Sequence, residues 1–414
     1  MVTNQVDFSA LYAQDDLEGQ RMRYERLAAR FGELFQDLGT PRFFSAPGRT
    51  EISGNHTDHQ LGRVLAASVN LDTIAAAQQN GGNVVRVYSE GFAPVIVPLE
   101  NLSPRKEEMG TTASIIRGCA AYLKEAGYRV GGFDAAITSN VLIGSGLSSS
   151  AAFEILINRI FDCLFNAGDI DAPLSARIAQ KAENNYFGKP SGLMDQMACA
   201  VGGMVAIDFK KPEAEIEMLS YDFSAKGFAL ANVGTDSSHD DLTDAYAAIP
   251  EEMHAVAHCF GEEKLRFVPF DAFYQAIPSL RAKLGDRAVL RALHFFDENE
   301  RVLRQVQALR DDDLQSFLRL TIASGESSWK LLQNVVAFPK SQPLALALAL
   351  SQRMLEGRGA WRVHGGGFAG TILGFVPHEM MAEYKKEMDA VFGDGACRPL
   401  YIRPVGSCEV VFPE

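Results

Sequence analysis

The apolar residues of this chain recur with a helical period in some stretches and alternate as in strands in others. Residues 63–99 hold β-branched runs that break at glycines, which predicts several strands. Residues 111–127 favour a helix that ends at a glycine. An amphipathic helix is also expected over residues 17–38, where apolar side chains recur at helical spacing at Leu27, Phe31, Leu34, Phe35 and Leu38.

The most regular junction of the chain is a strand, a loop and a helix between residues 131 and 165. Apolar and polar residues alternate over 133–138, as in a half-buried strand. A glycine- and serine-rich loop follows, and residues 149–165 predict a strong helix. A further apolar strand is expected at 204–209.

Charge and proline cluster in "KKPEAE", residues 210–215, where we place the boundary between an N-terminal lobe, 1–210, and a C-terminal lobe, 211–414. In the second lobe, residues 344–350 alternate leucine and alanine, the best helix formers, so we expect a helix rather than a strand. Ser341 as its cap and Pro343 in its first turn favour the same interpretation. Residues 361–376 predict a glycine-rich turn that enters a buried strand.

Composition sets the class of protein. Of the 414 residues, 47% are hydrophobic and 22% are charged, which is typical of a soluble globular protein with core enough for two lobes. The net charge of −13 argues against binding to nucleic acid or to anionic membranes. No stretch is long and apolar enough to span a membrane, and the first residues lack the pattern of a secretory signal. The six cysteines are scattered without a C-x-x-C pair, which argues against a zinc knuckle or a disulfide framework and favours a reducing, cytoplasmic location.

The loop before the helix at 149–165 reads "GSGLSSSAA", residues 144–152. Its glycines let backbone N–H groups approach an anion, and a helix N-terminus adds a partial positive charge. Serine hydroxyls can bind phosphate oxygens and Mg²⁺. The Gly-Lys-Ser/Thr ending of a Walker A loop is missing. The loop therefore predicts phosphate binding, with a serine-capped helix after a flexible turn as the alternative.

A second polar stretch, "GRTEISGNHTDHQLG" at residues 48–62, precedes an apolar run. It could form a metal site, a solvated loop or a pocket for a polar small molecule. His56 and His59 are three residues apart, but a zinc site needs a third ligand and a regular frame. Gly54 and Gly62 argue against such a frame, so the metal site is the least favoured of the three.

Four motifs follow one another over about 320 residues. "GRTEISGNHTDH" resembles a sugar-binding signature whose usual form is G-R-V-N-L-I-G-E-H-T-D-Y, and "LIGSGLSSSAAFE" resembles a nucleotide-binding motif. "SGLMDQ" (191–196) is similar to a segment that carries a catalytic aspartate, and "HGGGFAGT" (364–371) is similar to a glycine-rich third motif. Together they resemble the galactokinase family of the GHMP small-molecule kinases. This resemblance implies the α+β GHMP kinase fold, with an N-terminal lobe like ribosomal protein S5 domain 2, a ferredoxin-like C-terminal lobe and the active site between them.

The resemblance also implies an ATP-dependent sugar 1-kinase, most simply one that makes galactose 1-phosphate and ADP. By the motif match, Asp195 is the general base toward the C1 hydroxyl or the group that orients it, and Arg49 lies close to it and to the transferring phosphoryl group. Mg²⁺ is expected at Ser150 and Glu183. The glycines at 365–367 are expected to allow close backbone approach near the site. ATP is expected at Gly144, Ser145, Gly146, Leu147, Ser148, Ser149, Ser150 and Ala151.

The same match assigns the residues that hold the sugar. Asp58 is expected to accept hydrogen bonds from the C3 and C4 hydroxyls, and His56 is expected near the C6 hydroxyl. Tyr246 resembles a late sugar-contacting tyrosine, and Gly192 lies in the segment of Asp195. Asn55 completes the expected sugar-binding set.

The chain departs from the family at Glu51, Asn55 and His59, where the usual residues are Asn, Glu and Tyr. Because the replaced Glu would face C6, the neutral Asn55 suggests that a C6-modified galactose such as galacturonate could be accepted; the relieved repulsion is about 1–4 kcal/mol at about 4 Å. The aromatic pair expected around adenine is not evident in residues 110–118, so the nucleotide preference stays open.

A non-catalytic galactokinase-like sugar sensor is the remaining alternative, although the chain keeps Arg49, Asp195 and the loop serines. Mevalonate or homoserine kinase activity is disfavoured by the His-Thr-Asp signature. The expected partners are the sugar and ATP, with no nucleic acid and no membrane, and the expected state is a monomer or a weak homodimer.

Overall fold

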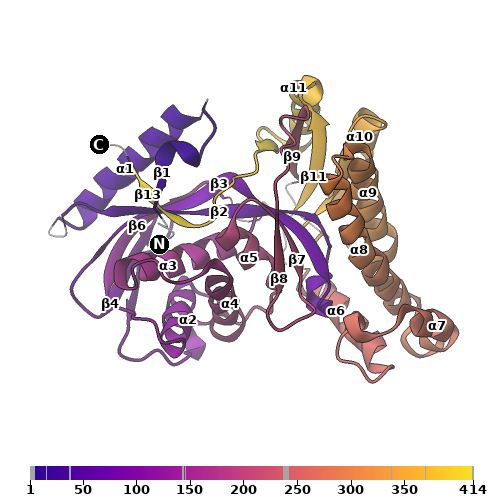
Figure 1. Cartoon of the computed structure of the whole chain (residues 1–414), viewed down its shortest axis with the longest axis horizontal. Coiled ribbons are helices and arrows are strands. Elements are labelled where there is room, and N and C mark those ends of the chain that lie inside the picture. The colour runs from indigo at the N-terminus through magenta and orange to yellow at the C-terminus, as the bar shows by residue number, and fades with distance from the viewer. Residues whose placement is uncertain are drawn as a thin grey trace.

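The computed structural model describes residues 5–14, 16–36, 39–141, 144, 146–235, 242–336, 338–368 and 370–412. The strands among these residues form two sheets, one in each half of the molecule (Figure 1). The first sheet runs in the order β1 (Gln5–Asp7), β13 (Cys408–Val411), β2 (Arg42–Ser53), β3 (Arg63–Gln79), β6 (Phe133–Ser139), β4 (Val84–Ser89) and β5 (Val95–Pro98), with β7 (Met204–Asp208) on β3 and β8 (Glu215–Leu219) on β7. The second sheet is antiparallel in the order β10 (Ala360–His364), β11 (Thr371–Pro377), β9 (Phe228–Gly234) and β12 (Cys397–Leu400).

Strand β3 is the centre of the first sheet and is buried over most of its 17 residues. It pairs with β2 along most of its length, with β6 over its C-terminal part and with β7 at its N-terminal end. Because helices cover both faces of the sheet, successive residues of β3 are buried on both faces, and its apolar residues come in runs rather than in strict alternation.

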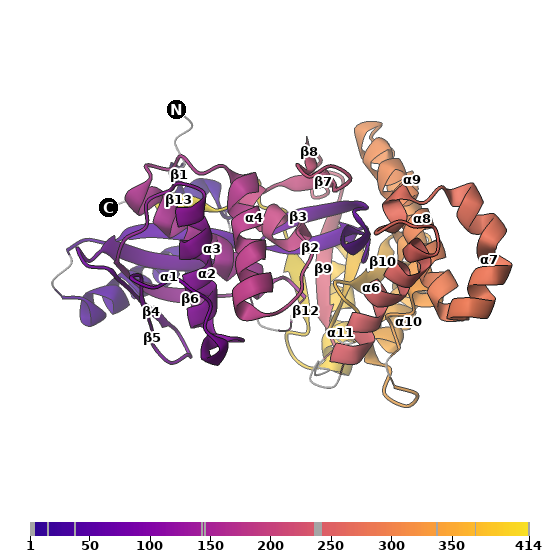
Figure 2. The same cartoon turned by 90° about the horizontal axis from the view of Figure 1, so that it is seen from below.

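The helices cover the sheets in layers. Helices α2 (Thr112–Glu125), α3 (Ser149–Phe165), α4 (Ala172–Ala182) and α5 (Met194–Val201) pack on one face of the first sheet, and α1 (Leu17–Leu34) packs on the other (Figures 1 and 2). The second half adds α6 (Thr243–His258), α7 (Phe270–Leu284), α8 (Asp286–Arg310), α9 (Leu314–Ser327), α10 (Pro343–Leu355) and α11 (His378–Phe392). Shorter helices are η1 (Phe8–Ala10), η2 (Asp58–Gln60), η3 (Lys106–Glu108), η5 (Leu265–Phe267) and the π-turns η4 (Glu183–Phe187) and η6 (Ser328–Leu332). None of the described helices could cross a membrane.

The chain does not divide between the sheets at one point. Strand β8 follows the predicted boundary at residue 210 yet belongs to the first sheet, and the C-terminal strand β13 returns to it beside β2. Arg403, on this returning segment, is buried and donates a hydrogen bond of 3.0 Å to Asp72 of β3. A cut between 1–210 and 211–414 would therefore divide the first sheet.

Several elements agree with the sequence-based predictions. The predicted helix at 149–165 is α3, the predicted strand at 133–138 is β6, and residues 344–350 lie in helix α10 rather than in a strand. The expected cap at Ser341 is wrong, because the residue before α10 is Gln342 and it makes no side-chain capping hydrogen bond. Helix α1 ends at Leu34, four residues before the predicted end.

Candidate active site

The polar stretch at 48–62 begins inside β2 and ends at η2. The pairing of β2 with β3 is interrupted twice, between Pro47 and Arg49 and between Glu51 and Ser53. Such irregularities bend a strand and redirect its side chains. The backbone N–H of Arg49 donates to the carbonyl of Leu147 at 3.0 Å. Strand β2 therefore contacts the loop predicted to bind phosphate, residues 144–152, which is called the phosphate loop below.

Arg49 and Asp195 form an ion pair at the start of helix α5. The Arg49 Nε atom lies 2.7 Å from Asp195 Oδ1, and another guanidinium N–H donates to the carbonyl of Gly146. The second carboxylate oxygen, Oδ2, accepts a hydrogen bond from the Ser148 hydroxyl. The Arg49 side chain is 7% exposed and that of Asp195 is 32% exposed, so the carboxylate keeps one open side.

This arrangement keeps Asp195 ionised. Burial by itself would raise the pKa of Asp195, but the charge and hydrogen bond of Arg49, with smaller effects from Ser148 and Lys189, bring its pKa below the ordinary value of 3.8. An ionised carboxylate at neutral pH can accept a proton, which is the chemistry expected of a base or of a group that orients a hydroxyl.

The phosphate loop lies against the glycine-rich third motif. A Cβ atom on Gly146 would lie 2.4 Å from Thr371 Oγ1 and 2.9 Å from His364 Nδ1, so only glycine allows this approach. His364 Nε2 accepts the backbone N–H of Glu51 at 3.1 Å, which leaves the ring proton on Nδ1 to face Thr371. Burial and the charges of Arg49 and Arg362 lower the pKa of His364, so its ring is neutral.

The loop residues predicted to hold ATP differ in their position and burial. Ser149 and Ser150 begin helix α3, where N–H groups lack helical partners. The side chains of Leu147 and Ala151 are buried in the core, so these residues offer only their backbone. Gly144 is exposed, whereas Ser145 lies outside the described residues.

The predicted metal ligands lie together at the base of this loop. Ser150 Oγ is 3.4 Å from Glu183 Oε1, and Gln196 Nε2 donates to Glu183 Oε2 at 2.9 Å and to Glu154 Oε2 at 3.1 Å. Burial, and then the charge of Glu183, raise the pKa of Glu154 well above its ordinary value. Its Oε1 is buried without a partner. Hard oxygen donors with an unfilled buried oxygen behind them fit Mg²⁺ held jointly with phosphate oxygens. No cluster of three or more His, Cys, Asp or Glu side chains for an all-protein metal site occurs among the described residues.

Asp58 and Gly192 lie in contact. A Cβ atom on Gly192 would lie 1.6 Å from Asp58 Oδ2, so any larger residue at 192 would displace the carboxylate. The other oxygen, Oδ1, accepts the backbone N–H of His59 at 2.9 Å. The structure thus brings Asp58 to the segment that carries Asp195.

His56 and Tyr246 both meet the glycine turn at 365–367. His56 Nε2 lies 3.0 Å from the Gly366 carbonyl and must donate to it, which leaves Nδ1 as a buried acceptor without a partner. Burial, and then the neighbouring His59, lower the pKa of His56 to about 3, so the ring stays neutral. The Tyr246 hydroxyl donates to the Gly367 carbonyl at 2.6 Å.

Comparison with known proteins identifies the family. The family model "GHMP kinases N terminal domain" matches residues 114–203, and "Galactokinase galactose-binding signature" matches residues 29–79. A galactokinase from Glaesserella parasuis serovar 5 is 31% identical over 348 residues, which cover 82% of this chain and 86% of the relative. The chain belongs to the galactokinase family. A Haemophilus influenzae galactokinase is 31% identical over 350 residues, with the same coverage of 82% and 86%.

Solved structures of the superfamily share the fold. The structure of Lactococcus lactis galactokinase complexed with galactose matches with a TM-score of 0.80 at 24% identity, over 94% of this chain and 99% of that one. A mevalonate kinase matches with a TM-score of 0.62 at 15% identity, over 88% and 99% of the two chains. The predicted GHMP kinase fold and galactokinase family membership are therefore confirmed.

Asn55 was predicted to contact the sugar, and the geometry around its side chain does not support that role. Its side chain is fully buried, its amide N–H groups donate to Glu51 Oε1 at 2.9 Å and to the Gly365 carbonyl at 2.7 Å, and its oxygen accepts from Ser328 at 3.1 Å and Asn334 at 2.8 Å. An amide has two donors and two acceptor positions, and all four are used by the protein. Asn55 therefore joins the turn at 54–57, here called the signature turn, to the glycine turn at 365–367. Its amide offers a sugar no free hydrogen-bonding position.

Glu51 stands where the family signature has Asn, just as Asn55 stands where it has Glu, and it completes this buried network. Its carboxylate accepts from Arg362 Nη2 at 2.7 Å as well as from Asn55. The acid at 51 is thus neutralised by a buried arginine of the second sheet, which nothing in the motif alone would have revealed. Lys264 is a further unpredicted contact: it donates to the carbonyl of His59 at 2.9 Å and so supports the signature turn from the side of η5.

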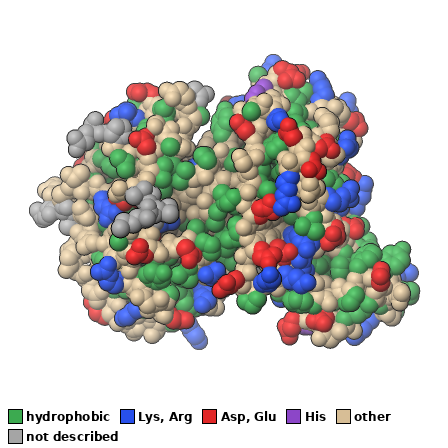
Figure 3. All heavy atoms as spheres, in the orientation of Figure 1, with side chains coloured by type: hydrophobic (Ala, Val, Ile, Leu, Met, Phe, Trp, Pro, Cys, Tyr) green, Lys and Arg blue, Asp and Glu red, His purple; other side chains and the backbone are tan. Residues whose placement is uncertain are grey.

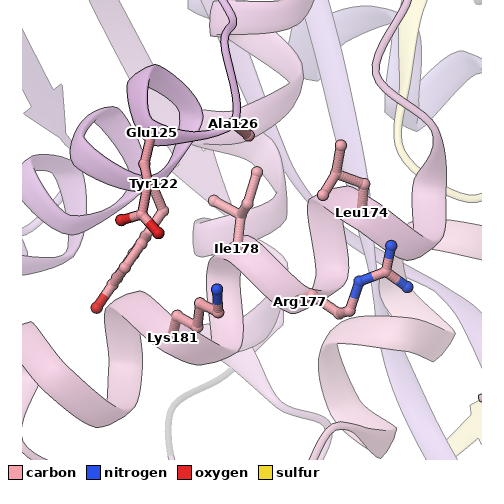
Figure 4. A pocket seen from close by; sticks show the side chains of 7 residues that line it. All are labelled: Tyr122, Glu125, Ala126, Leu174, Arg177, Ile178 and Lys181. Carbon is pink, nitrogen blue, oxygen red and sulfur yellow. The ribbon is translucent and has the colours of Figure 1, made fainter. Parts of the chain in front are cut away.

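Two cavities among the described residues lie away from the predicted site. A cavity of about 220 Å³ between α2 and α4 is lined by Tyr122, Arg177 and Lys181 with neighbouring apolar side chains (Figure 4). A larger one of about 620 Å³ lies beside α7 and α8. Neither contains a predicted site residue. On the face drawn in Figure 3, acidic and basic side chains are interspersed.

Asn55→Asp should destabilise the fold rather than alter sugar affinity alone. The change places a second carboxylate beside Glu51 and removes both amide donors, so we expect the free energy of unfolding to fall by about 3–5 kcal/mol in urea denaturation. The control is Asn101→Asp, because exposed Asn101 needs only its oxygen, which accepts from Ser103 N–H at 2.9 Å. A variant that unfolds like the unmodified protein and changes only the KM for sugar would contradict the structural role of Asn55.

Proposed function

We propose that this protein is an ATP-dependent galactose 1-kinase, which transfers the γ-phosphoryl group of ATP to the C1 hydroxyl of galactose. The observation that carries the proposal is the ionised Asp195, held by Arg49 and Ser148 directly beside the phosphate loop. The galactokinase relatives, matched over most of the chain, support the same activity.

In the proposed reaction, the open side of Asp195 accepts a hydrogen bond from the C1 hydroxyl. The C1 oxygen forms a bond to the γ-phosphorus while the bond from that phosphorus to the bridging oxygen of ADP breaks, and the hydroxyl proton passes to Asp195. Arg49 keeps Asp195 ionised and brings positive charge next to the reacting atoms. Backbone N–H groups at the start of α3 and the hydroxyls of Ser149 and Ser150 bind the phosphates.

ATP and Mg²⁺ are the proposed cofactors. Ser150 and Glu183 would hold Mg²⁺, which when bound supplies positive charge against the phosphate oxygens. Glu154 and Gln196 fix the orientation of Glu183 from behind.

The sugar is proposed to lie against Asp58, Gly192 and His56. The carboxylate of Asp58 can accept hydrogen bonds from two adjacent hydroxyls, and the unpartnered Nδ1 of His56 can accept one more. Tyr246 contributes by fixing the glycine turn on which His56 rests.

A sugar with a carboxylate at C6 is the second candidate substrate. One observation favours it: Asn55 is neutral and the charge of Glu51 is paired with Arg362, so neither adds an unpaired negative charge to the sugar site. A non-catalytic sugar sensor is less well supported, because both Arg49 and Asp195 are in place.

We further propose that the protein acts in the cytoplasm as a monomer or a weak homodimer. The net charge of −13 supports a protein without nucleic-acid or membrane partners.

A substrate panel tests the proposed function. Purified protein with ATP and Mg²⁺ is given galactose, galacturonate, N-acetylgalactosamine or glucose, and ADP release is measured. We expect kcat/KM to be highest for galactose and at least about 100-fold lower for glucose, whose C4 hydroxyl points differently. Galacturonate turnover above that of galactose would make the acidic sugar the preferred substrate. No turnover with any of the four sugars would contradict the proposed kinase activity.

The pH dependence of kcat/KM tests the role of Arg49. In the unmodified protein the pKa of Asp195 lies below 3.8, so protonation of this group costs activity only at pH below that value. Arg49→Met leaves burial opposed only by the smaller effects of Ser148 and Lys189 and so raises the pKa of Asp195. The acid limb should therefore move to higher pH while kcat falls about 10²- to 10³-fold. Asp195→Asn is the control, since it lacks the titrating group and should show a uniformly low rate. An acid limb that stays in place in Arg49→Met would contradict the assignment.

A further inference from the structure

Lys189 lies at the mouth of the active site, in the loop between η4 and α5. Its ammonium Nζ is 3.1 Å from Glu183 Oε1, and its side chain is 60% exposed. The backbone is fixed more firmly, because the N–H groups of Gly188 and Lys189 donate to the Glu183 carbonyl at 3.0 and 3.2 Å. The loop is therefore built to hold this one cation over Glu183, while the long stem stays free to move.

The oxygen that Lys189 contacts is the one proposed for the metal. Ser150 Oγ approaches the same Glu183 Oε1 at 3.4 Å, whereas Oε2 is taken by Gln196. An ammonium and a divalent cation repel each other at such short range, so both cannot keep their best positions on one carboxylate oxygen. Lys189 must move from Glu183 when a metal binds there.

A further cation would add to the positive charge at the transferring phosphoryl group. Arg49 uses Nε for Asp195 and a second N–H for the Gly146 carbonyl. Three of its five N–H groups remain, but its charge is already paired with the Asp195 carboxylate. Lysine is a compact charge on a flexible stem with three donors, which suits a group that changes partner. Phosphate oxygens are the nearest strong acceptors that ATP would bring to this site.

We propose that Lys189 is a further catalytic residue, which neutralises Glu183 in the free protein and passes to the transferring phosphoryl group when nucleotide and metal bind. The proposal deepens the kinase function proposed above and rests on it. The exchange keeps the acidic site neutral before ATP arrives and adds positive charge where negative charge develops in phosphoryl transfer.

Two measurements with opposite expected signs test this exchange. Lys189→Met keeps the stem and removes the charge, so Mn²⁺ alone should bind the nucleotide-free protein about 3- to 10-fold more tightly by electron paramagnetic resonance, because Glu183 is no longer paired. The same variant should lose about 10- to 100-fold in kcat, because the phosphoryl group loses its cation. Lys189→Arg, which keeps a positive charge, should restore part of both values.

The matched control is Lys181→Met on α4, whose Nζ lies 5.3 Å from the ring centre of Tyr122 and lines the separate cavity of Figure 4. It should leave both values unchanged. Unchanged or weaker Mn²⁺ binding in Lys189→Met overturns the exchange, and a kcat within about twofold of the Lys181→Met value overturns the catalytic role. If the unmodified protein phosphorylates no sugar, the proposed function fails, and the Mn²⁺ measurement still judges the pairing of Lys189 with Glu183.

Discussion

The ion pair between Arg49 and Asp195 is the constraint on which the site depends. Arg49 comes from an irregular stretch of β2, and Asp195 comes from the first turn of α5, so their contact fixes β2 against a helix although the two residues are 146 positions apart. Without it, the pKa of Asp195 would rise, and less of the carboxylate would be ionised to take a proton from a hydroxyl. The phosphate loop is joined to the pair by Ser148 and by the Gly146 carbonyl, so the nucleotide and acceptor sides are positioned together.

The second half of the molecule contributes close backbone contacts and one buried charge, that of Arg362. The glycine turn after β10 accepts hydrogen bonds from Asn55, His56 and Tyr246 through its carbonyls. The buried Asn55 amide, with all its hydrogen-bonding positions used, joins residues 54–57 to this glycine turn. Arg362 neutralises the carboxylate of Glu51, which accepts a hydrogen bond from Asn55. The proposed sugar site therefore receives residues from both halves, and no single motif contains it.

Much of this could be predicted from the sequence, for local reasons. Helix α10 follows from the propensities of Leu and Ala, and the positions of Arg49, Ser150, Glu183 and Asp195 followed from a motif resemblance. What the sequence did not reveal depended on contacts distant in sequence. The contacts of Asn55 with Ser328, Asn334 and Gly365, which use its amide, leave no local signal. The return of β13 to the first sheet and the place of Lys189 over Glu183 likewise leave no local signal.

A double-mutant cycle on kcat/KM tests most directly whether Arg49 and Asp195 act as one catalytic unit. Arg49→Met, Asp195→Asn and the double variant are compared with the unmodified protein, using galactose and ATP with Mg²⁺. If the pair acts together, the double variant should be no slower than the slower single variant, within about threefold. Losses that multiply, so that the double variant is slower by about another 100-fold, would mean that the two residues act independently and would contradict the account.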